Sequence, residues 1–246
     1  MSKTPSTNLP TQSYLATKPA DSRIIAVQPG QELPGGWIMD KAGHVITGKL
    51  GKQKVEVFGR AARVLEDFAN TSGDTESIQR FTRAYGVLNQ NDREHHSIQG
   101  TSDFIPGDRF LIHCDDWLEA QRIFRANWEA GRNGGEELAK RLSVAIAPGV
   151  SAGPVVKARV TWSRRGFQLE LQPDDLWRAL SLAFIGFSDR MRKCQNPTCD
   201  APYFLATRRD QRYCNEKCAR LVANRKWWDK HGQEWRENRA EHEKSA

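Results

Sequence analysis

Apolar and polar positions follow two different periods along the chain. Between residues 35 and 58, glycine-punctuated segments alternate in polarity, as in Val55-Glu56-Val57, which predicts two or three short strands joined by turns. Residues 61–70 instead carry apolar side chains at helical spacing, and a second such stretch follows Gly73-Asp74. Two core helices are therefore expected, with these apolar residues: Val64, Leu65 and Phe68 in the first, and Ile78, Phe81 and Tyr85 in the second.

A third helix is predicted after residue 112. Phe110-Leu111-Ile112 forms either a short strand or the lead into this helix, and Asp115 or Asp116 is expected to cap its N-terminus. Its apolar residues again recur at helical spacing. The side chains expected in the core are Trp117, Phe124 and Trp128.

The clearest strand pattern is a hairpin in the second half of the chain. Residues 155–162 and 167–172 alternate in polarity on either side of a turn at residues 163–166. Pro173-Asp174-Asp175 then precedes a strongly apolar helix from Leu176 to about Arg190. Residues 34–190 are therefore expected to form an α+β domain.

Both ends of the chain are polar. Residues 1–33 are rich in Ser, Thr, Pro and Gln and are expected to be a disordered tail, and residues 233–246 a second polar tail. The apolar run Ile24 to Val27 is too short for a signal peptide. The longest apolar segment, Leu176 to Phe187, is interrupted by Arg178 and is shorter than the roughly 20 residues that span a bilayer. We expect a cytoplasmic protein with no membrane segment.

Four cysteines lie in two close pairs near the C-terminus, at Cys194, Cys199, Cys214 and Cys218. Zinc prefers four soft ligands in a tetrahedron, and two short chelating loops supply them readily. Two disulfides or four unrelated thiols are the alternatives, and a reducing cytoplasm disfavours disulfides. If all four thiolates bind Zn²⁺, no position stays open for water, so the ion would be structural. Residues 191–232 are expected to form a treble-clef-like zinc finger, with strands near residues 201–205 and 212–214 and a helix from about Cys218.

The helix predicted after Cys218 combines basic and aromatic residues. Residues 191–246 hold 13 Lys and Arg against 8 Asp and Glu, in a chain of net charge +7. Trp228, seven residues after Leu221, is expected to be buried against the strand at Tyr203-Phe204, whereas Trp227 is expected to be exposed, and Gly232 is the predicted end of the helix. The basic groups either contact nucleic-acid phosphates or form an ordinary solvated face; they are Arg220, Arg225, Lys226 and Lys230.

Residues 193–228 resemble the CGNR-type zinc fingers of bacterial proteins. The matching features are Cys194-x4-Cys199 with Pro197 between them, the aromatic strand at Tyr203-Phe204, the approach Arg212-Tyr213-Cys214 and the spacing to Cys218. The tetrapeptide Cys-Gly-Asn-Arg that names the family is not present in this sequence. Cys218 is followed instead by Ala219-Arg220-Leu221, and an Asn-Arg pair comes only later, at Asn224-Arg225. In such proteins the finger often follows an α+β domain of the ABATE type, to which Phe68-Ala69-Asn70-Thr71 and the following helix are loosely similar. The resemblance implies a transcription regulator.

No catalytic constellation is visible in the sequence. It contains no phosphate-binding glycine loop, nucleophile elbow or metalloprotease helix, so we expect no enzyme and assign no catalytic residue. Cys114, beside His113, is expected to be a small buried apolar residue. The leading hypothesis is a zinc-finger protein that binds DNA and regulates transcription. The alternative is a protein-interaction or scaffold module in which the finger is only structural and the partner is another protein.

Overall fold

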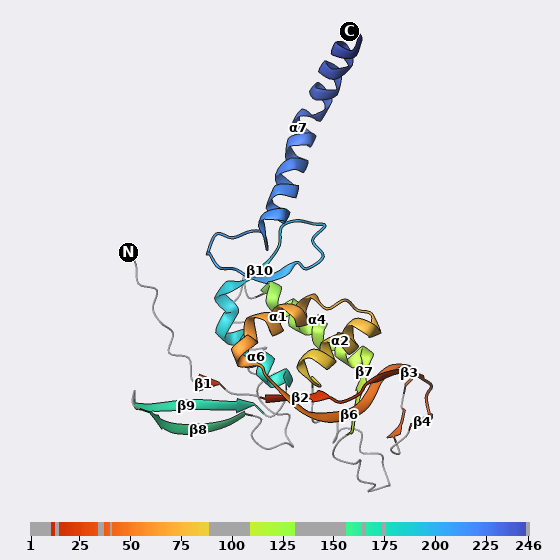
Figure 1. Cartoon of the computed structure of the whole chain (residues 1–246), viewed down its shortest axis with the longest axis vertical. Helices are drawn as coiled ribbons and strands as arrows, with labels where there is room; N and C mark the ends of the chain where they lie inside the picture. The colour runs from red at the N-terminus through yellow and green to blue at the C-terminus, as the bar shows by residue number, and fades with distance from the viewer. Residues whose placement is uncertain are drawn as a thin grey trace. The chain divides into compact units, whose positions relative to one another are not determined.

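Figure 1 shows the computed structural model, which describes residues 11–12, 15–33, 37–39, 41–88, 109–130, 156–163, 166–173 and 176–244. The chain divides into two compact units, Met1–Asp189 and Arg190–Ala246. The first contains strands, mostly antiparallel, and helices, which makes it an α+β unit. The second contains the four clustered cysteines and a long helix.

The sheet of the first unit is organised around one long strand, β6 (Gly43–Glu56). Its second half pairs with β2 (Leu15–Pro19), and its first half pairs with both β3 (Arg23–Val27) and β7 (Arg109–His113). All three pairings are antiparallel. Because residues 45–47 of β6 pair with both β3 and β7, these two strands flank β6 on opposite edges.

Two predictions about the first sixty residues were wrong. The expected disordered tail at residues 1–33 contains β2 and β3, which pair with β6, and a short strand β4 (Glu32–Leu33) that pairs with β5 (Trp37–Ile38). The expected two or three short strands between residues 35 and 58 are β5 and the 14-residue β6. The glycines of this segment do not interrupt β6. At Gly48 the lack of a side chain lets the backbone of Asp21 come close to the strand, since a Cβ there would lie 2.3 Å from the backbone oxygen of Asp21.

The hairpin in the second half of the sequence is confirmed. Strands β8 (Val156–Ser163) and β9 (Gly166–Pro173) are antiparallel, with Ser163 opposite Gly166. The short strand β1 (Thr11–Gln12) pairs in parallel with β9. The predicted helix after the hairpin is α6 (Leu176–Phe187), followed by the 3₁₀ turn η2 (Ser188–Arg190).

The three remaining predicted helices are also present. They are α1 (Ala61–Asn70), preceded by the 3₁₀ turn η1 (Phe58–Arg60), α2 (Thr75–Tyr85) and α4 (Cys114–Ala130). Asp74 caps α2, since its Oδ1 accepts a hydrogen bond of 2.8 Å from the Ser77 N–H. Hydrogen bonds from Ser72 and Ser77 lower the pKa of Asp74 to about 2. Helix α4 begins at Cys114, so Asp115 and Asp116 lie in its first turn rather than before it.

The helices pack through an aromatic cluster centred on the fully buried Phe68 of α1. Its ring centroid lies 5.0 Å from those of Trp117 and Phe124, 5.4 Å from that of Phe81 and 6.1 Å from that of Trp177. Most of these pairs are edge-to-face, the arrangement that the ring quadrupoles favour. The predicted burial of Trp117, Phe124 and Trp128 is confirmed.

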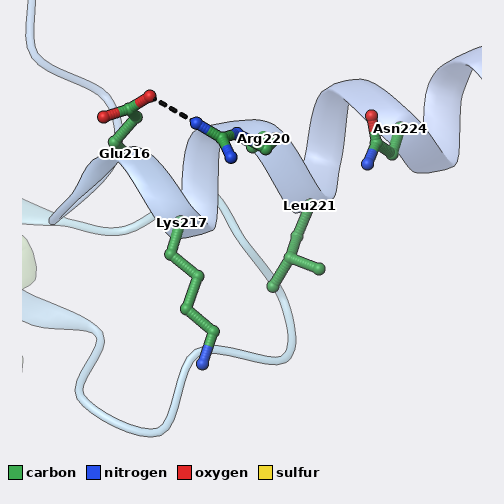
Figure 2. Close-up of a pocket in the computed structure, with 5 residues that line it drawn as sticks. All are labelled: Glu216, Lys217, Arg220, Leu221 and Asn224. Atoms are coloured by element: carbon green, nitrogen blue, oxygen red, sulfur yellow. Dashed lines mark hydrogen bonds and ion pairs between the residues drawn. The ribbon is translucent and has the colours of Figure 1, made fainter.

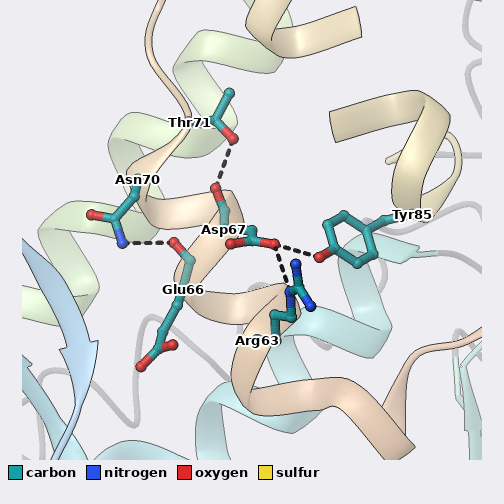
Figure 3. A network of polar contacts seen from close by, with 6 residues as sticks. All are labelled: Arg63, Glu66, Asp67, Asn70, Thr71 and Tyr85. Carbon is teal, nitrogen blue, oxygen red and sulfur yellow. Dashed lines mark hydrogen bonds and ion pairs between the residues drawn. The ribbon is translucent and has the colours of Figure 1, made fainter. Parts of the chain in front are cut away.

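Polar side chains complete the junction of α1 with its neighbours. The buried Gln121 of α4 donates from Nε2 to the backbone oxygens of Phe68 and Thr71, both at 2.8 Å. These bonds satisfy carbonyls at the C-terminal end of α1 that have no partner within the helix. On the side of α1 that faces α2, Asp67 accepts from the Tyr85 hydroxyl and pairs with Arg63 (Figure 3). Burial and the Asp67 carboxylate raise the pKa of Tyr85 to about 12.

The second unit departs from the predicted layout in two places. Its two strands, β10 (Met191–Lys193) and β11 (Tyr203–Leu205), pair with one another, and residues 212–214 form no strand. Helix α7 runs from Glu216 to Lys244, so it does not end at Gly232, and residues 233–244 are helical rather than a polar tail. None of the described helices is both long and apolar enough to cross a membrane.

We expect the replacement of Phe68 by Ala to destabilise the first unit by roughly 3–5 kcal/mol, because it removes the ring that the other aromatic side chains contact. Urea denaturation followed by circular dichroism measures this change. Ile123→Ala, on the exposed face of α4, is the control and should change the free energy of unfolding by less than about 0.5 kcal/mol. Equal effects of the two substitutions would contradict the assignment of Phe68 as the centre of the core.

Candidate metal centre

The first cysteine pair sits on a turn that directly follows β10. The backbone N–H of Cys194 donates to Pro202 O at 2.7 Å, which holds the base of this loop closed next to the pairing of Lys193 with Tyr203. Within the loop, the Cys199 N–H donates to Asn196 O at 3.1 Å. This tight turn brings Cys194 and Cys199 to the same side of the loop.

The second pair lies at the start of α7. Cys214 precedes the helix, and Cys218 is in its first turn. Asn215 caps the helix, because its Oδ1 accepts a hydrogen bond of 2.9 Å from the Cys218 N–H. The Gln195 N–H donates to Arg212 O at 3.0 Å, which ties the first cysteine loop to the segment that leads into Cys214.

The four sulfur atoms have the geometry of a tetrahedral metal site. All lie within 4.8 Å of one another. Three of the separations are 3.6 Å (Cys199 to Cys214), 3.6 Å (Cys214 to Cys218) and 3.7 Å (Cys199 to Cys218). A metal bound to four thiolates at about 2.3 Å gives sulfur–sulfur edges of about 3.8 Å. All five cysteines are free, and these separations are far above the length of a disulfide bond, about 2 Å.

Asn196 is a functional residue that the sequence analysis did not identify. It lies between the first two cysteines, is only 3% exposed, and donates from Nδ2 to Cys218 Sγ at 3.4 Å. Its Oδ1 accepts from the Thr198 N–H at 3.3 Å and hydroxyl at 3.0 Å, which fixes the orientation of the amide. The bond from Asn196 lowers the pKa of Cys218 and favours its thiolate. From the sequence, Asn196 is recognisable only as a residue that favours a turn. Its contact with Cys218 could not be predicted, because the two residues are 22 positions apart.

A small apolar shell surrounds the sulfurs. Cys194 and Cys218 are buried with Phe204 and Ala206, and Tyr213 packs against this group. Burial is the largest cause that raises the pKa of Cys214. The fifth cysteine, Cys114, lies in the first unit, where it is buried and where desolvation raises its pKa to about 11, as expected for an inert apolar residue.

Among the described residues, the four cysteines are the one close group of three or more His, Cys, Asp or Glu side chains able to hold a metal ion. The predicted metal ligands therefore come together in space. A four-sulfur site can bind a metal such as zinc and leaves no position for a reacting water.

The four predicted phosphate contacts on α7 are all exposed but do not share one face. Lys226 and Lys230 are four residues apart and lie on the same side of the helix, whereas Arg225 is four residues from Leu221 and lies next to it. Arg220 pairs with Glu216 at 2.7 Å. A hollow of about 320 Å³ lies along this stretch of the helix. Figure 2 shows the ion pair, with Lys217 and Leu221 extending from the same side of the helix.

The predicted burial of Trp228 was wrong, whereas the predicted exposure of Trp227 is confirmed. Trp228 is 48% exposed rather than buried against Tyr203-Phe204, and Trp227 is 47% exposed, so the two do not differ. The error follows from the course of α7, which is mostly exposed beyond its first turn. Trp228 instead packs along its own helix, with its ring centroid 5.0 Å from that of Trp227 and 5.3 Å from that of Trp235.

Comparisons with known proteins identify no relative. No family model, no curated protein and no solved structure matches the chain. The geometry of the site is therefore the basis for the functional argument.

We expect Asn196→Ala to weaken metal binding by about 10–100-fold, because it removes the hydrogen bond that supports Cys218 as a thiolate. Competition against a chelator of known affinity measures the change. Gln195→Ala is the matched control, since Gln195 lies in the same turn, is exposed, and contributes a backbone bond that the substitution keeps. A variant at Asn196 that binds metal as tightly as the control would show that the amide does not tune the site.

Proposed function

We propose that the four cysteines bind Zn²⁺ and that residues 191–232 form a treble-clef-like zinc finger. The support is the pairing of ligands on a turn and a helix start, the sulfur separations close to a tetrahedral edge, and the free thiols of all four cysteines. The ion is structural, because four thiolates complete its coordination.

We further propose that the protein is a cytoplasmic DNA-binding protein that regulates transcription. The observation that carries this proposal is the charge of the metal module and the first half of α7. Residues 190–230 hold 11 Lys and Arg against 4 Asp and Glu, while residues 231–246 hold 3 against 4. A zinc ion with four thiolate ligands has a net negative charge. The excess of positive charge is larger than the amount needed to neutralise it. Concentrated positive charge of this kind favours contact with phosphates.

The exposed positions of these cations also support phosphate contact. On α7 they are Lys217, Arg220, Arg225, Lys226 and Lys230, and in the loop before Cys214 they are Arg208, Arg209 and Arg212. Lys226 and Lys230 form the most favourable pair, since they share a side of the helix that faces away from Trp228 and Trp235. Arg220, held by Glu216, and Arg225, beside Leu221, are secondary contacts in this proposal.

A protein-interaction function is the second candidate, and one observation favours it. Trp227, Trp228 and Trp235 are each more than 40% exposed on α7. Large exposed aromatic residues in a row are typical of surfaces that bind another protein. Trp228 and Trp235 lie on the side of the helix opposite Lys226 and Lys230, so protein binding through these two rings is compatible with DNA binding.

We expect Cys199→Ser to abolish stoichiometric zinc binding and to unfold the metal module while the first unit stays folded. Structural zinc contributes on the order of 10–16 kcal/mol to fingers of this size, whereas the first unit has its own core. Elemental analysis combined with thermal denaturation measures both effects. Cys114→Ser, in the first unit, is the control that should keep the zinc. Retained zinc in the Cys199 variant, or the unfolding of both units together, would contradict the proposal.

For DNA binding, we expect the double substitution of Lys226 and Lys230 by Gln to weaken binding to duplexes of any sequence. The slope of log affinity against log salt should become shallower by about 0.9 for each phosphate that the variant no longer neutralises. Fluorescence anisotropy over a salt series measures this slope. The charge-matched control is Arg236 and Lys244 to Gln, on the distal half of the same helix. Identical slopes for both variants and the unmodified protein would rule out α7 as the phosphate-binding element and favour the protein-interaction function.

A further inference from the structure

The exposed aromatic side of α7 repeats every seven residues. Leu221, Trp228 and Trp235 are spaced by seven and are 47%, 48% and 42% exposed. We call these three residues the heptad stripe. The rings of Trp228 and Trp235 are in edge-to-face contact, with centroids 5.3 Å apart, so the stripe is continuous along that stretch of the helix.

A repeat of seven is characteristic of a helix that pairs with another helix. An isolated α-helix has 3.6 residues per turn, so a stripe of period seven drifts by about 20° per repeat unless two helices wind around one another. Residues seven apart also share a face on a helix that packs against a globular core, but most of α7 beyond its first turn is exposed and packs on no such core. The 29 residues of α7 correspond to about 43 Å, or about four repeats, which is long enough for a stable pair of helices.

The polar residues between members of the stripe favour a second copy of this chain as the partner. Asn224, His231 and Asn238 each lie three residues after a member of the stripe and also repeat every seven. In a parallel, in-register pair each of these residues meets its own counterpart. An amide both donates and accepts, so two facing Asn side chains satisfy one another, and such a layer fixes the register of a pair. An antiparallel pair would instead place the Trp residues against Asn or His.

One pair of opposite charges flanks the stripe at the spacing that a parallel pair of helices requires. Glu234 borders one edge and Arg239 the other, five residues later, the spacing at which parallel paired helices form ion pairs across their interface. Arg239 lies over the Trp235 ring at 5.4 Å, which places it beside the stripe. Arg220 would meet Arg225 of the other copy at the same spacing, but Glu216 already pairs with Arg220 at 2.7 Å and offsets this repulsion.

We propose that α7 is a dimerisation helix, and that two copies of the chain pair in parallel and in register through the heptad stripe. The pairing positions the two metal modules at the same end of the dimer. Lys226 and Lys230, on the side away from the stripe, stay exposed in the pair. The proposal rests on the stripe and its edges, so it stands whether or not the protein binds DNA.

Sedimentation equilibrium of the full-length, zinc-loaded protein tests the dimer. The expected mass is twice the 27.9 kDa of the chain. Trp235→Ala should weaken dimerisation by at least about 30-fold, the effect of removing a central aromatic residue from an interface. Lys226→Ala, on the opposite side of α7, is the control and should leave the mass unchanged. Both variants must retain stoichiometric zinc, which reports that the metal module is folded.

A charge-reversal set tests the parallel register. Glu234→Arg and Arg239→Glu should each weaken the dimer, because each places like charges across the interface. The combination of the two should bind more tightly than Arg239→Glu alone, since the opposite charges face one another again. A double variant that is weaker than both single variants would overturn the parallel arrangement.

The dimer itself is overturned by either of two results. One is a monomer at concentrations up to about 100 µM, at which even weak specific pairs associate. The other is a dimer that Trp235→Ala leaves intact. A monomer whose tryptophan fluorescence changes on addition of duplex DNA would assign the stripe to nucleic acid and would equally overturn the proposal.

Discussion

The convergence of four sulfur atoms is the constraint on which the second unit depends. Apart from the cysteines, the buried apolar side chains among its described residues are few: Met191, Tyr203, Phe204, Leu205 and Ala206. A core of that size cannot offset the conformational entropy of ordering some forty residues. Two strands of three residues add little, because a two-stranded pair is marginal by itself. A metal bound by the four cysteines would therefore determine whether β10, β11 and the start of α7 come together, and Asn196 contacts this cluster through Cys218.

Helix α7 is attached to this unit only near its first turn, through Cys218, and most of its remaining described length is exposed. Isolated helices are marginal in water, and Gly232 in the middle of this one costs roughly 1 kcal/mol relative to Ala. Local contacts at the surface of the helix include the pair of Arg220 with Glu216, the bond of Gln233 with Glu237, the edge-to-face tryptophan rings, and Arg239 over the Trp235 ring. A helix of 29 residues that is mostly exposed is better explained when a partner covers the heptad stripe.

The sequence predicted best those elements whose evidence is local. Helices α1, α2 and α4 and the hairpin of β8 and β9 follow from periodicity over a dozen residues, and the cysteine cluster follows from ligand spacing. The strands β2 and β3 were missed because a polar composition concealed them, and their stability comes from pairing with β6, up to about forty residues away. The end predicted for α7 was wrong. Glycine often ends a helix, but here the helix continues through Gly232. The Trp228 ring covers this glycine, with Cε3 only 3.0 Å from where a Cβ would lie.

The two sides of α7 explain how a single helix could serve two proposed functions. Lys226 and Lys230 lie away from the heptad stripe, so pairing through Leu221, Trp228 and Trp235 does not remove them from solvent. Within the second unit, net positive charge is confined to the metal module and the first half of the helix. In a parallel pair the two positive regions are therefore adjacent, and a duplex would meet twice the number of phosphate contacts at one end of the dimer. The salt dependence of DNA binding scales with the number of phosphate contacts. Dimerisation through the heptad stripe would therefore increase this salt dependence, although the stripe itself would not contact DNA.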